Sequence, residues 1–448
     1  MLLSQKNKKI GILGLGKTGT SSYQALSGVA SVICWDDVSA TREIFQTKFE
    51  DANIVNLSDP QWNEQDRILV SPGIHPLHQI IKIANSYGID ITSDIDLLFE
   101  EASGSNFIAV TGTNGKSTST ALAAHILKEA DLDYPSGGNI GDAVLSLNTN
   151  KPGYVLELSS FQLDLIKSFK AKIAVLLNIT PDHLDRYQTM EAYIDSKKKI
   201  LSMLDENGFC IIGVDNEITK NIANSLTKSM IKIIPISALE PQPHGVSVLD
   251  NIVYDNIFEA KILELQNNKR LQGTHNKENI ASCYAICRIL GVKPEKIITG
   301  INSFKGLPHR MEYVCSIGGI SFYNDSKATN TDSASRSLDA LDNIYWLAGG
   351  IVKDDNVESL SKYSNKIKKA YFFGRDKEIF AKAMNGKMEF TICADLEEAF
   401  AIAFKDAIGD KPAFKNILLA PAAASLDQFK NFEHRGEVFI RLCREITI

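Results

Sequence analysis

Two glycine-rich loops of this chain occupy the same local setting, between a short apolar run and a run with helical periodicity. The first loop, GLGKTG at residues 14–19, follows the apolar run IGIL, and the second, TGTNGKST at residues 111–118, follows FIAV. A short buried strand that enters a helix through glycines is typical of the parallel sheets of α/β proteins. We therefore expect an α/β domain to begin shortly before each loop.

Other apolar runs extend this pattern along the chain. SVICWDD and DRILVSPG are predicted strands of the first domain, YVLELSS and AKIAVLLNIT of the second, and ISFYNDS, NIYWLAGG, KAYFFG and NILLAPAA follow a new start near Phe304. The length suits about three domains of ordinary size. We predict an α/β protein of three α/β domains: an N-terminal Rossmann-like domain at residues 1–101, a central P-loop ATPase-like parallel sheet at residues 102–305, and a C-terminal Rossmann-like domain at residues 306–448.

The charge balance and the apolar content limit the classes of function. Hydrophobic residues make up 44% of the chain, so each domain can bury a core. The formal net charge of −6 leaves no basic excess to neutralise phosphates, so we expect no nucleic-acid partner. No run approaches the roughly 18 apolar residues of a membrane span, and the N-terminal apolar run is too short for a signal peptide. We expect a cytoplasmic monomer without a transmembrane segment.

The seven cysteines are scattered and form no CxxC pair, which argues against a zinc site and against a disulfide framework. Cys283 and Cys287 share one face of the predicted helix NIASCYAICRIL. We expect both to be small core residues.

The first glycine loop fits the GxGxxG spacing between a strand and a helix. The acidic pair Asp36–Asp37 ends the next predicted strand, where a ribose-binding carboxylate lies in dinucleotide-binding folds. Glycines let backbone N–H groups approach a pyrophosphate at a helix N-terminus. This geometry suits a nicotinamide dinucleotide or a nucleotide-sugar diphosphate, and a packing turn without a ligand is the third alternative. The loop SPGIHP at residues 71–76, at the end of another strand, favours a ligand site.

The second glycine loop carries the Gly-Lys-Ser of a phosphate loop, but Val110 lies where the usual GxxxxGK[ST] spacing has its first glycine. Gly112 and Gly115 still let the backbone curl, so we interpret the loop as a shortened phosphate loop. Lys116 is placed to reach the β- and γ-phosphates of a nucleoside triphosphate, and the hydroxyl of Ser117 is placed to bind Mg²⁺.

Two further metal-ligating side chains follow predicted strands of the same domain. Glu157 ends YVLELSS, and His183 lies in NITPDHLDRY after the next strand. A lone histidine on such a loop is usually structural, but a carboxylate and an imidazole beside a phosphate loop suit a hard cation. We therefore expect Mg²⁺ near Glu157 and His183.

Eight stretches, in order along the central and C-terminal predicted domains, resemble the Mur ligases, the family that builds the peptide stem of the bacterial cell wall. The phosphate loop and DHLDRY are shared across that family, whereas LELSSFQL, NDSKATN and SLDQFKNFEHRG are more specific to its D-glutamate-adding branch. The eight stretches are TGTNGKST, GGNIG (137–141), LELSSFQL (156–163), DHLDRY (182–187), HNKEN (275–279), GLPHRME (306–312), NDSKATN (324–330) and SLDQFKNFEHRG (425–436).

The resemblance implies an ATP-dependent amide ligase of peptidoglycan precursor synthesis with two Mg²⁺ sites. Its substrates would be UDP-MurNAc-L-Ala and D-glutamate. The carboxylate of the L-alanine residue would attack the γ-phosphate of ATP to give an acyl phosphate, and the amine of D-glutamate would then displace phosphate as the amide forms. A carboxylate is a poor acylating agent near neutral pH, so phosphorylation supplies the leaving group.

The resemblance also implies roles for single residues. Catalytic roles are implied for Lys116, His183, Lys197 and Lys327, and Mg²⁺ contacts for Ser117, Glu157, His183 and Lys197. Nucleotide contacts are implied for Gly112, Thr113, Asn114, Gly115, Lys116, Ser117, Thr118, Asn276, Asn279, Arg310 and Asp325. Contacts with the UDP-linked substrate are implied for Thr18, Asp36, Ser71, Asn139 and Gln162, and contacts with D-glutamate for Thr329, Lys353, Ser425 and Phe432.

Lys197 is implied to carry a carbamate formed with CO₂, because in the family the modified lysine follows an aromatic residue, here Tyr193, and three further residues. Lys198 follows directly and stays an alternative carrier. From the residues alone, the three consecutive lysines predict a solvent-exposed helix face. A carbamate turns the cation into an anion, which is how a lysine can serve a Mg²⁺ site.

The chain departs from the family pattern at three places. Ile351 and Val352 in GGIVK stand where relatives usually have small or acidic residues, Ala420 in LAPAAAS removes a hydroxyl, and Lys17 adds a cation to the first loop. Alternatives remain: a ligase for L-alanine or a diamino acid, a nicotinamide dehydrogenase, or a P-loop switch protein. SLDQFKNFEHRG argues against the first, the unused TGTNGKST against the second, and the acceptor-site residues against the third.

Overall fold

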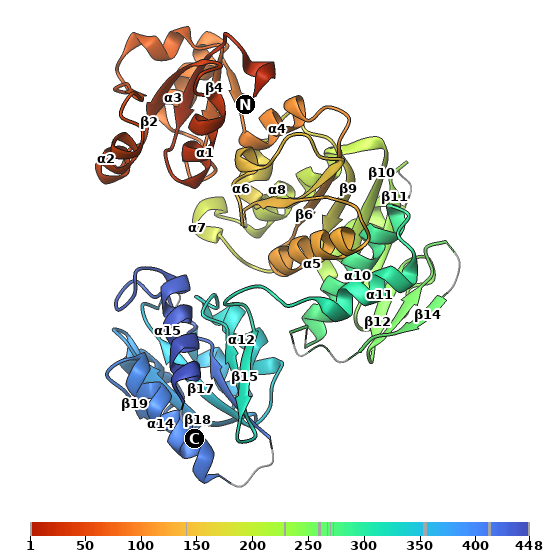
Figure 1. Cartoon of the computed structure of the whole chain (residues 1–448), viewed down its shortest axis with the longest axis vertical. Coiled ribbons are helices and arrows are strands. Elements are labelled where there is room, and N and C mark those ends of the chain that lie inside the picture. The colour runs from red at the N-terminus through yellow and green to blue at the C-terminus, as the bar shows by residue number, and fades with distance from the viewer. Residues whose placement is uncertain are drawn as a thin grey trace. The chain divides into compact units, whose positions relative to one another are not determined.

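The computed structural model describes residues 2–139, 141–227, 230–258, 261–266, 268, 270–271, 273–352, 356–410 and 414–446 (Figure 1). These residues form three sheets, of five, nine and six strands. The chain divides into two compact units, Met1–Leu265 with Glu278–Asn302, and Gln266–Lys277 with Ser303–Ile448. The first unit contains the first two sheets, and the second unit contains the third.

The first sheet is wholly parallel, with the strand order β3-β2-β1-β4-β5. The strand order reverses beside β1, and ligands of open α/β sheets bind outside the carboxyl ends of the strands at such a point. The first glycine loop leaves β1 there, and the predicted Rossmann-like topology is confirmed. The elements are β1 (Lys9–Leu13), α1 (Lys17–Leu26), β2 (Ser31–Trp35), α2 (Ser39–Lys48), β3 (Asn53–Ile54), β4 (Arg67–Val70), α3 (Gln79–Tyr87), β5 (Asp90–Thr92) and α4 (Asp94–Glu101).

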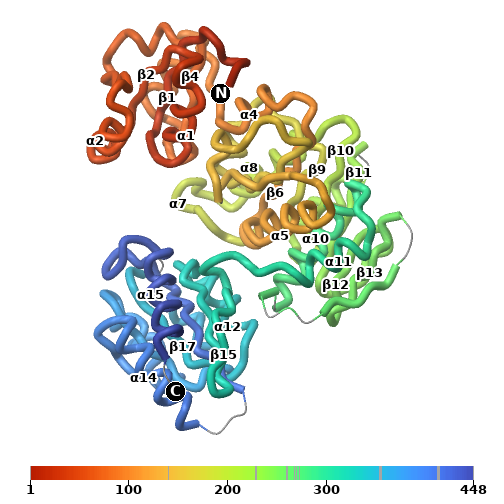
Figure 2. Tube along the Cα trace, viewed as in Figure 1, coloured from red at the N-terminus to blue at the C-terminus, as the bar shows by residue number. Residues whose placement is uncertain are grey.

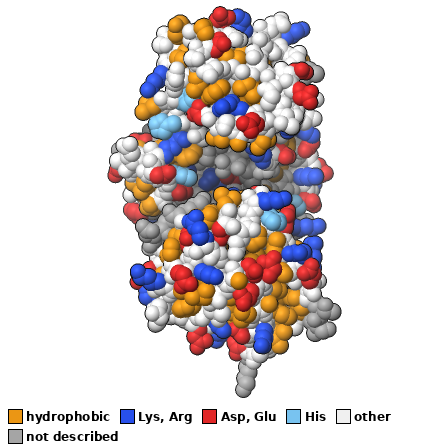
Figure 3. Space-filling model, turned by 90° about the vertical axis from the view of Figure 1, so that its left-hand side faces the viewer, with side chains coloured by type: hydrophobic (Ala, Val, Ile, Leu, Met, Phe, Trp, Pro, Cys, Tyr) orange, Lys and Arg blue, Asp and Glu red, His pale blue; other side chains and the backbone are white. Residues whose placement is uncertain are grey.

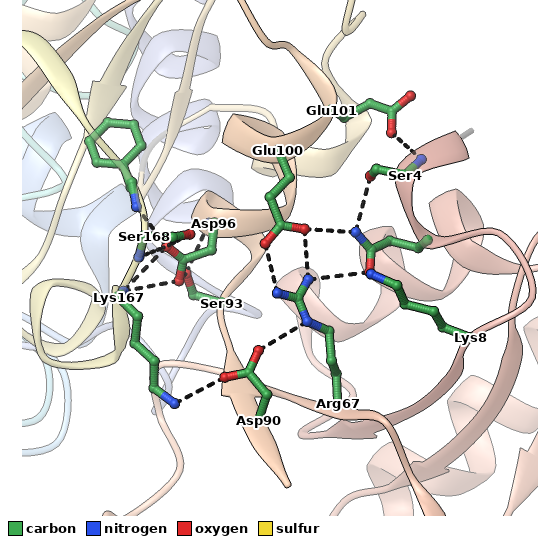
Figure 4. A network of polar contacts seen from close by, with 12 residues as sticks. Ser4, Lys8, Arg67, Asp90, Ser93, Asp96, Glu100, Glu101, Lys167 and Ser168 are labelled. Carbon is green, nitrogen blue, oxygen red and sulfur yellow. Dashed lines mark hydrogen bonds and ion pairs between the residues drawn. The ribbon is translucent and has the colours of Figure 1, made fainter.

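Helix α4 connects the first sheet to the second through polar and apolar contacts (Figure 4). Arg67 on β4 donates two hydrogen bonds of 2.7 Å to Glu100 on this helix and one of 3.0 Å to Asp90. The buried carboxylate of Asp96 accepts hydrogen bonds from the backbone N–H groups of residues 167–169. One continuous apolar core contains side chains of β1, α4 and the second sheet. Helix α4 is therefore the structural link between the two sheets.

The second sheet has the order β14-β13-β12-β11-β10-β9-β6-β8-β7. The strands from β7 to β12 in this order are parallel to one another. Strand β13 pairs antiparallel with both β12 and β14, and the prediction of a parallel sheet did not include these hairpins. Because β6 lies between β8 and β9, the carboxyl ends of these strands meet where the phosphate loop leaves β6 for α5 (Figure 2). The strands are β6 (Asn106–Thr111), β7 (Ser136–Gly138), β8 (Gly153–Glu157), β9 (Ala171–Leu176), β10 (Leu204–Gly213), β11 (Lys232–Ser237), β12 (Val246–Leu249), β13 (Ile252–Asp255) and β14 (Lys261–Glu264).

The helices along this part of the chain are α5 (Lys116–Glu129), α6 (Ser160–Leu165), α7 (Leu184–Tyr187), α8 (Met190–Ser202), α9 (Glu217–Leu226), α10 (Thr274–Ile289) and α11 (Pro294–Ser303). Cys283 and Cys287 are fully buried on α10, which confirms their prediction as core residues. All seven cysteines are free thiols, six of them buried, and Cys315 half-buried.

The third sheet has the order β15-β16-β20-β17-β18-β19, with β15 antiparallel to the others. All residues of the central strand β17 are buried, as expected for a strand covered on both faces, and this burial explains its unbroken apolar sequence. The elements are β15 (Glu312–Ile317), β16 (Ile320–Asn324), α12 (Thr331–Asp339), β17 (Ile344–Gly349), β18 (Ile367–Phe373), α13 (Lys377–Met384), β19 (Phe390–Ile392), α14 (Leu396–Gly409), β20 (Lys415–Leu419) and α15 (Phe432–Glu445).

Charged and hydrophobic side chains both occur on the face drawn in Figure 3. Basic and acidic side chains are interspersed over the face that Figure 3 shows. Among the described residues, no helix has the length and the apolar content needed to cross a membrane. The α/β class with three sheets is confirmed, and the domain limits at residues 101 and 305 stay predictions.

Candidate active site

The phosphate loop connects β6 to α5 and depends on two glycines. Gly112 and Gly115 have φ angles of 153° and 81°, and a Cβ atom on Gly115 would lie 2.3 Å from Oδ1 of Asn279. Backbone conformation and space therefore both require glycine at residue 115. Val110 is a fully buried residue inside β6, so the loop begins after it. The missing first glycine corresponds to a strand position.

The segment that follows β9 holds the loop in shape. The Asn114 N–H donates to Oδ1 of Asn178 at 3.0 Å, and the Thr180 N–H donates to Oγ1 of Thr113 at 3.0 Å. The Thr113 hydroxyl also lies 3.1 Å from that of Tyr193 on α8. Asn178 and Thr180 were not predicted as site residues, and their only signal was their position between a strand and DHLDRY.

Two lysines donate to one carbonyl oxygen of this loop. Lys116 Nζ lies 2.8 Å from the carbonyl oxygen of Gly112 and 2.8 Å from that of Thr113. Lys197 Nζ, from α8, lies 2.9 Å from the same oxygen of Gly112. The loop therefore has two lysine amines at its base, where the phosphates of a nucleotide would bring negative charge.

Lys197 is buried, in contrast to the solvent-exposed position that three consecutive lysines predict. It is 1% exposed, while the side chains of Lys198 and Lys199 are 46% and 48% exposed. Burial and the neighbouring charge of Lys116 lower the pKa of Lys197 well below that of an ordinary lysine. The prediction of a solvated face is thus wrong for Lys197, whose environment favours the neutral amine.

Glu157 ends β8, in register with Val110 on β6. Its side chain is 1% exposed, and its Oε1 accepts a hydrogen bond from Nδ2 of Asn139 at 2.8 Å. Its other oxygen, Oε2, is buried and has no hydrogen-bond partner among the residues that the structure describes. A buried carboxylate oxygen without a donor is costly, and a bound cation would satisfy it.

His183 lies at the start of α7 with a left-handed φ of 54°. Its ring centroid is 4.9 Å from that of Phe161 and 6.3 Å from that of Tyr193. Lys197 Nζ lies 4.9 Å from the centroid of the same Tyr193 ring. Tyr193 is therefore the neighbour that His183 and Lys197 share.

Two buried side chains carry the kinds of oxygen that bind Mg²⁺. Ser117, buried at the start of α5, and Glu157 supply the hydroxyl and carboxylate oxygens that Mg²⁺ prefers. Within the described ranges, no group of three His, Cys, Asp or Glu side chains could hold a metal ion. A second ion near His183 would therefore need a further anionic ligand.

The first glycine loop is held by two of the residues predicted to bind the UDP-linked substrate. Asp36 accepts hydrogen bonds from the N–H groups of Leu15 at 2.7 Å and Val38 at 2.9 Å, and the Ser71 hydroxyl donates to the Gly14 carbonyl at 2.9 Å. These side chains shape the loop. Thr18 follows in the first turn of α1 and is half-buried.

Two cationic side chains, Lys17 and Arg186, connect segments that follow strands of the first sheet with segments that follow strands of the second. Lys17 donates to the carbonyl oxygen of Gly141, so it is not merely solvent-facing. Arg186 of DHLDRY donates to the carbonyl oxygen of Pro72 at 3.2 Å, and its guanidinium carbon lies 3.9 Å from the centroid of the Phe161 ring. The first glycine loop and the SPG loop thus both contact loops of the second sheet.

Asn139 and Gln162, which we predicted as substrate contacts, have structural partners. Asn139 orients Glu157, as described above. Gln162 is 4% exposed and forms a capping box at the start of α6, where its Oε1 accepts a hydrogen bond from the Ser159 N–H at 3.0 Å.

In the second unit, Asp325, Lys327 and Thr329 follow β16. Asp325 is buried, which raises the pKa of its carboxyl group, and it accepts hydrogen bonds from the Met311 N–H at 3.2 Å and from the hydroxyl of Ser337. Lys327 Nζ lies 4.0 Å from the centroid of the Phe432 ring. Lys327, for which a catalytic role is implied, and Phe432, a predicted D-glutamate contact, therefore lie side by side.

Arg435 on α15 is a buried residue that the sequence prediction missed. It is fully buried, and burial lowers the pKa of its guanidinium to about 9. Its nitrogens donate to the carbonyl oxygens of Ser326 at 2.9 Å, Ala423 at 3.1 Å and Gly349 at 3.3 Å. These carbonyls belong to NDSKATN, LAPAAAS and GGIVK, so Arg435 connects the three loops. Its only signal was its place in the stretch FEHRG.

The departures from the family pattern have backbone roles here. Ile351 and Ala424 pair with each other through two hydrogen bonds of 2.8 Å, and the carbonyl oxygen of Ala420 accepts one of 2.8 Å from the Trp346 indole. Lys353 lies outside the described residues. Of the other predicted residues, Thr118 lies in the first turn of α5, Asn276 and Asn279 are buried one turn apart on α10, Arg310 is half-buried, and Ser425 is buried.

Comparisons with known proteins agree with this geometry. Residues 110–287 match the Mur ligase middle domain, and residues 309–422 match the glutamate ligase domain of Mur ligases. The chain is 52% identical over 444 residues to UDP-N-acetylmuramoylalanine–D-glutamate ligase of Rickettsia bellii, covering 99% of each chain. It is 37% identical over 495 residues to the protein of the same name from Wolbachia pipientis wMel, covering 98% of this chain and 96% of that one.

Solved structures share the fold at low identity. UDP-N-acetylmuramate-alanine ligase from Thermotoga maritima matches with a TM-score of 0.61 at 18% identity, over 98% of this chain and 99% of that chain. A pseudomurein peptide ligase type C from Methanothermus fervidus matches with a TM-score of 0.59 at 17% identity, over 98% and 100% of the two chains. At such identities the likeness concerns the fold alone.

Proposed function

The chain belongs to the Mur ligase family, and we propose that it is the ATP-dependent ligase that adds D-glutamate to UDP-N-acetylmuramoyl-L-alanine in peptidoglycan precursor synthesis. The names and full-length coverage of the Rickettsia and Wolbachia relatives support this substrate pair. The chemistry rests most directly on Oε2 of Glu157, beside the phosphate loop. This oxygen is buried and has no hydrogen-bond partner among the described residues.

In the proposed reaction, an oxygen of the substrate carboxylate attacks the γ-phosphorus of ATP, and the bond to the bridging oxygen breaks. ADP leaves, and the substrate becomes an acyl phosphate. The amine of D-glutamate then attacks the acyl carbon and loses a proton, and inorganic phosphate leaves as the amide forms. Because two anions must meet, neutralisation and positioning supply most of the catalysis.

Lys116 would exchange its two loop carbonyls for the β- and γ-phosphates of ATP. Both carbonyls are neutral acceptors at 2.8 Å, and a phosphate oxygen is a stronger partner for an ammonium group. The N–H groups of residues 115–118, at the start of α5, would face the phosphates, as at other phosphate loops, whereas those of Thr113 and Asn114 donate to Asn178.

We propose that Ser117 and Glu157 hold one Mg²⁺, and that His183 and a carbamylated Lys197 support a second. Bound there, the ions would neutralise charge on the phosphates. Carbamylation joins the neutral amine to CO₂ with loss of a proton, and the lowered pKa of Lys197 favours that neutral amine. The burial of Lys197 supports it as the carrier over the exposed Lys198.

The remaining assignments follow the loops on which the residues lie. The first glycine loop, with Thr18, Asp36 and Ser71, would bind the UDP group, and Asn139 and Gln162 would lie near the muramyl part. Asn276, Asn279, Arg310, Asp325 and Lys327 would contact the nucleotide, and Thr329, Lys353, Ser425 and Phe432 would hold D-glutamate. We also expect a monomer in the cytoplasm, with domain limits near residues 101 and 305.

The experiment that tests the function measures phosphate release from ATP in the presence of UDP-MurNAc-L-Ala and one amino acid at a time. We expect release that depends on D-glutamate. Release with a diamino acid but not with D-glutamate would indicate another member of the family. Hydrolysis that ignores the amino acid would favour a switch protein, and tight NAD(H) binding without ATP binding would favour a dehydrogenase.

A further inference from the structure

Glu278 is a buried carboxylate on α10 that none of the assignments above uses. Its Oε2 accepts a hydrogen bond of 3.1 Å from Nδ2 of Asn178. The next residue, Asn279, contacts the helix behind the phosphate loop, where its Oδ1 accepts a hydrogen bond of 3.1 Å from the hydroxyl of Ser119. This turn of α10 therefore contacts two neighbours of the phosphate loop: Asn178, through Glu278, and Ser119, through Asn279.

The Asn178 side chain contacts both the backbone N–H and the backbone carbonyl oxygen of Asn114 in the loop. Its Oδ1 accepts the Asn114 N–H at 3.0 Å, and its Nδ2 lies 3.4 Å from the Asn114 carbonyl oxygen. The main-chain oxygen of Asn178 also accepts a hydrogen bond of 2.8 Å from the Thr113 N–H. The contacts of Asn114 thus depend on how the Asn178 side chain is oriented, whereas Thr113 is held by the Asn178 main chain.

A carboxamide has an acceptor on one side and a donor on the other, whereas an ionised carboxylate only accepts. Glu278 therefore selects the orientation in which Nδ2 of Asn178 faces Glu278 and Oδ1 faces the Asn114 N–H. In the reversed orientation, the Asn178 amide would present its N–H groups to the N–H of Asn114, and its oxygen to the carboxylate. Both contacts would be repulsive.

The space around Glu278 is matched to this side chain. Gly213, the last residue of β10, lies so close that a Cβ atom on it would be 2.3 Å from Oε1 of Glu278. The carboxylate thus lies between the end of β10 and the Asn178 amide.

We propose that Glu278 is a positioning residue for nucleotide binding, because it orients the Asn178 amide that holds the Asn114 peptide in the conformation that receives the phosphates. The inference rests on the proposed function only in taking ATP as the nucleotide. It adds a determinant of ATP affinity that contacts neither phosphate nor metal.

The test compares two variants of similar size, Glu278→Gln and Glu278→Met, by the dissociation constant of ATP measured without the other substrates. Gln retains an acceptor for Nδ2 of Asn178, so its affinity should stay within about threefold of the parent protein. Met has no acceptor, so it should weaken ATP binding about tenfold, as expected for one buried hydrogen bond to a charged group. The dissociation constant for UDP-MurNAc-L-Ala should not change in either variant.

Equal ATP affinity of the Gln and Met variants would overturn the proposal. In an Asn178→Ala background the difference between them should vanish, and a difference that persists there would also overturn it. If the Met variant does not fold, Glu278→Asp replaces it, since the shorter carboxylate cannot reach Asn178, and parental ATP affinity in that variant would overturn the proposal. D-Glutamate-dependent phosphate release by the parent protein tests the proposed function separately from these binding measurements.

Discussion

The amine of Lys197 lies 2.9 Å from the carbonyl oxygen of Gly112, so a side chain of α8 contacts the backbone of the phosphate loop. Lys116 donates to the same oxygen. Burial lowers the pKa of Lys197, and the positive charge of the nearby Lys116 lowers it further. The reactive form of an amine toward CO₂ is therefore favoured in the unliganded loop.

Replacement of Lys197 by Ala should lower D-glutamate-dependent phosphate release by about 100-fold or more, since it removes the ligand that we propose for a second ion. A small carboxylate such as acetate should restore part of the activity, because it can occupy the place of the carbamate. Lys198→Ala is the matched control, with an exposed side chain on the same helix, and should keep nearly full activity. Loss of activity in Lys198→Ala with full activity in Lys197→Ala would move the carbamate to Lys198.

Lys116→Ala should abolish acyl-phosphate formation while UDP-MurNAc-L-Ala binds within about threefold of its normal affinity. The reason is that Lys116 belongs to the loop after β6, whereas the UDP group is expected at the loop after β1. Trapping of the acyl phosphate and calorimetric titration with the UDP substrate measure the two effects. Similar losses in both would contradict the assignment of the two loops.

Glu157→Gln should shift the magnesium dependence of the reaction to concentrations about 10- to 100-fold higher. The amide keeps the size of the side chain but removes the negative charge from the buried Oε2, which has no hydrogen-bond donor. Initial rates over a magnesium titration measure the shift. An unchanged titration curve would place the ion elsewhere.

Arg67→Met should destabilise the first unit by about 2 kcal/mol at pH 7, because it removes hydrogen bonds between charged groups that are largely buried. Burial alone would raise the pKa of Glu100, but the hydrogen bonds and charge of Arg67 hold it below its usual value. The stabilisation is therefore complete above the unfolded pKa of about 4.3 and disappears as pH falls through the lower folded pKa.

Denaturant unfolding followed by the fluorescence of Trp62, which is fully buried in the first unit, measures this difference. A Trp346→Phe background removes the signal of the second unit. Lys9→Met, which removes an exposed ion pair with Glu64, is the control and should change the stability by less than about 0.5 kcal/mol. A loss at Arg67→Met that does not shrink between about pH 5 and pH 3 would contradict the role of Glu100.

Arg435→Met should destabilise the second unit by about 3 kcal/mol, because it leaves buried carbonyl oxygens on three loops without donors. It should also raise the KM for D-glutamate more than that for ATP, since NDSKATN, GGIVK and LAPAAAS carry predicted D-glutamate contacts. Trp346 fluorescence and initial rates measure the two effects, with Arg441→Met, an exposed arginine on the same helix, as control. Equal changes in both KM values would indicate only a general loss of structure.

The strands could be predicted where they are buried on both faces. The two phosphate-type loops were also evident, because each combines glycines with a preceding strand and a following helix. The hairpin of β12 and β13 was not predicted, although Asp250 and Asn251 between the strands adopt the positive φ angles of a hairpin turn. Alternating apolar residues on either side of Asp-Asn were the signal that could have revealed it.

The burial of Lys197 could also have been inferred from spacing. Tyr193, Lys197 and Ile200 are separated by four and three residues, which places them on one face of α8, and all three are buried. The prediction gave more weight to the charge of the three consecutive lysines than to this periodicity. By contrast, the contacts of Asn178, Glu278 and Arg435 join segments far apart in the chain, and no local pattern reports such pairs.

The buried free thiols allow each sheet to be followed chemically. Cys34 lies on β2, Cys210 on β10 and Cys393 beside β19, and burial raises the pKa of these thiols to about 12, 12 and 11. An alkylating reagent reaches such a thiol only when the surrounding strands separate. The labelling rates of these three cysteines, resolved by mass spectrometry, would thus report separately how often each of the three sheets opens, with and without each substrate.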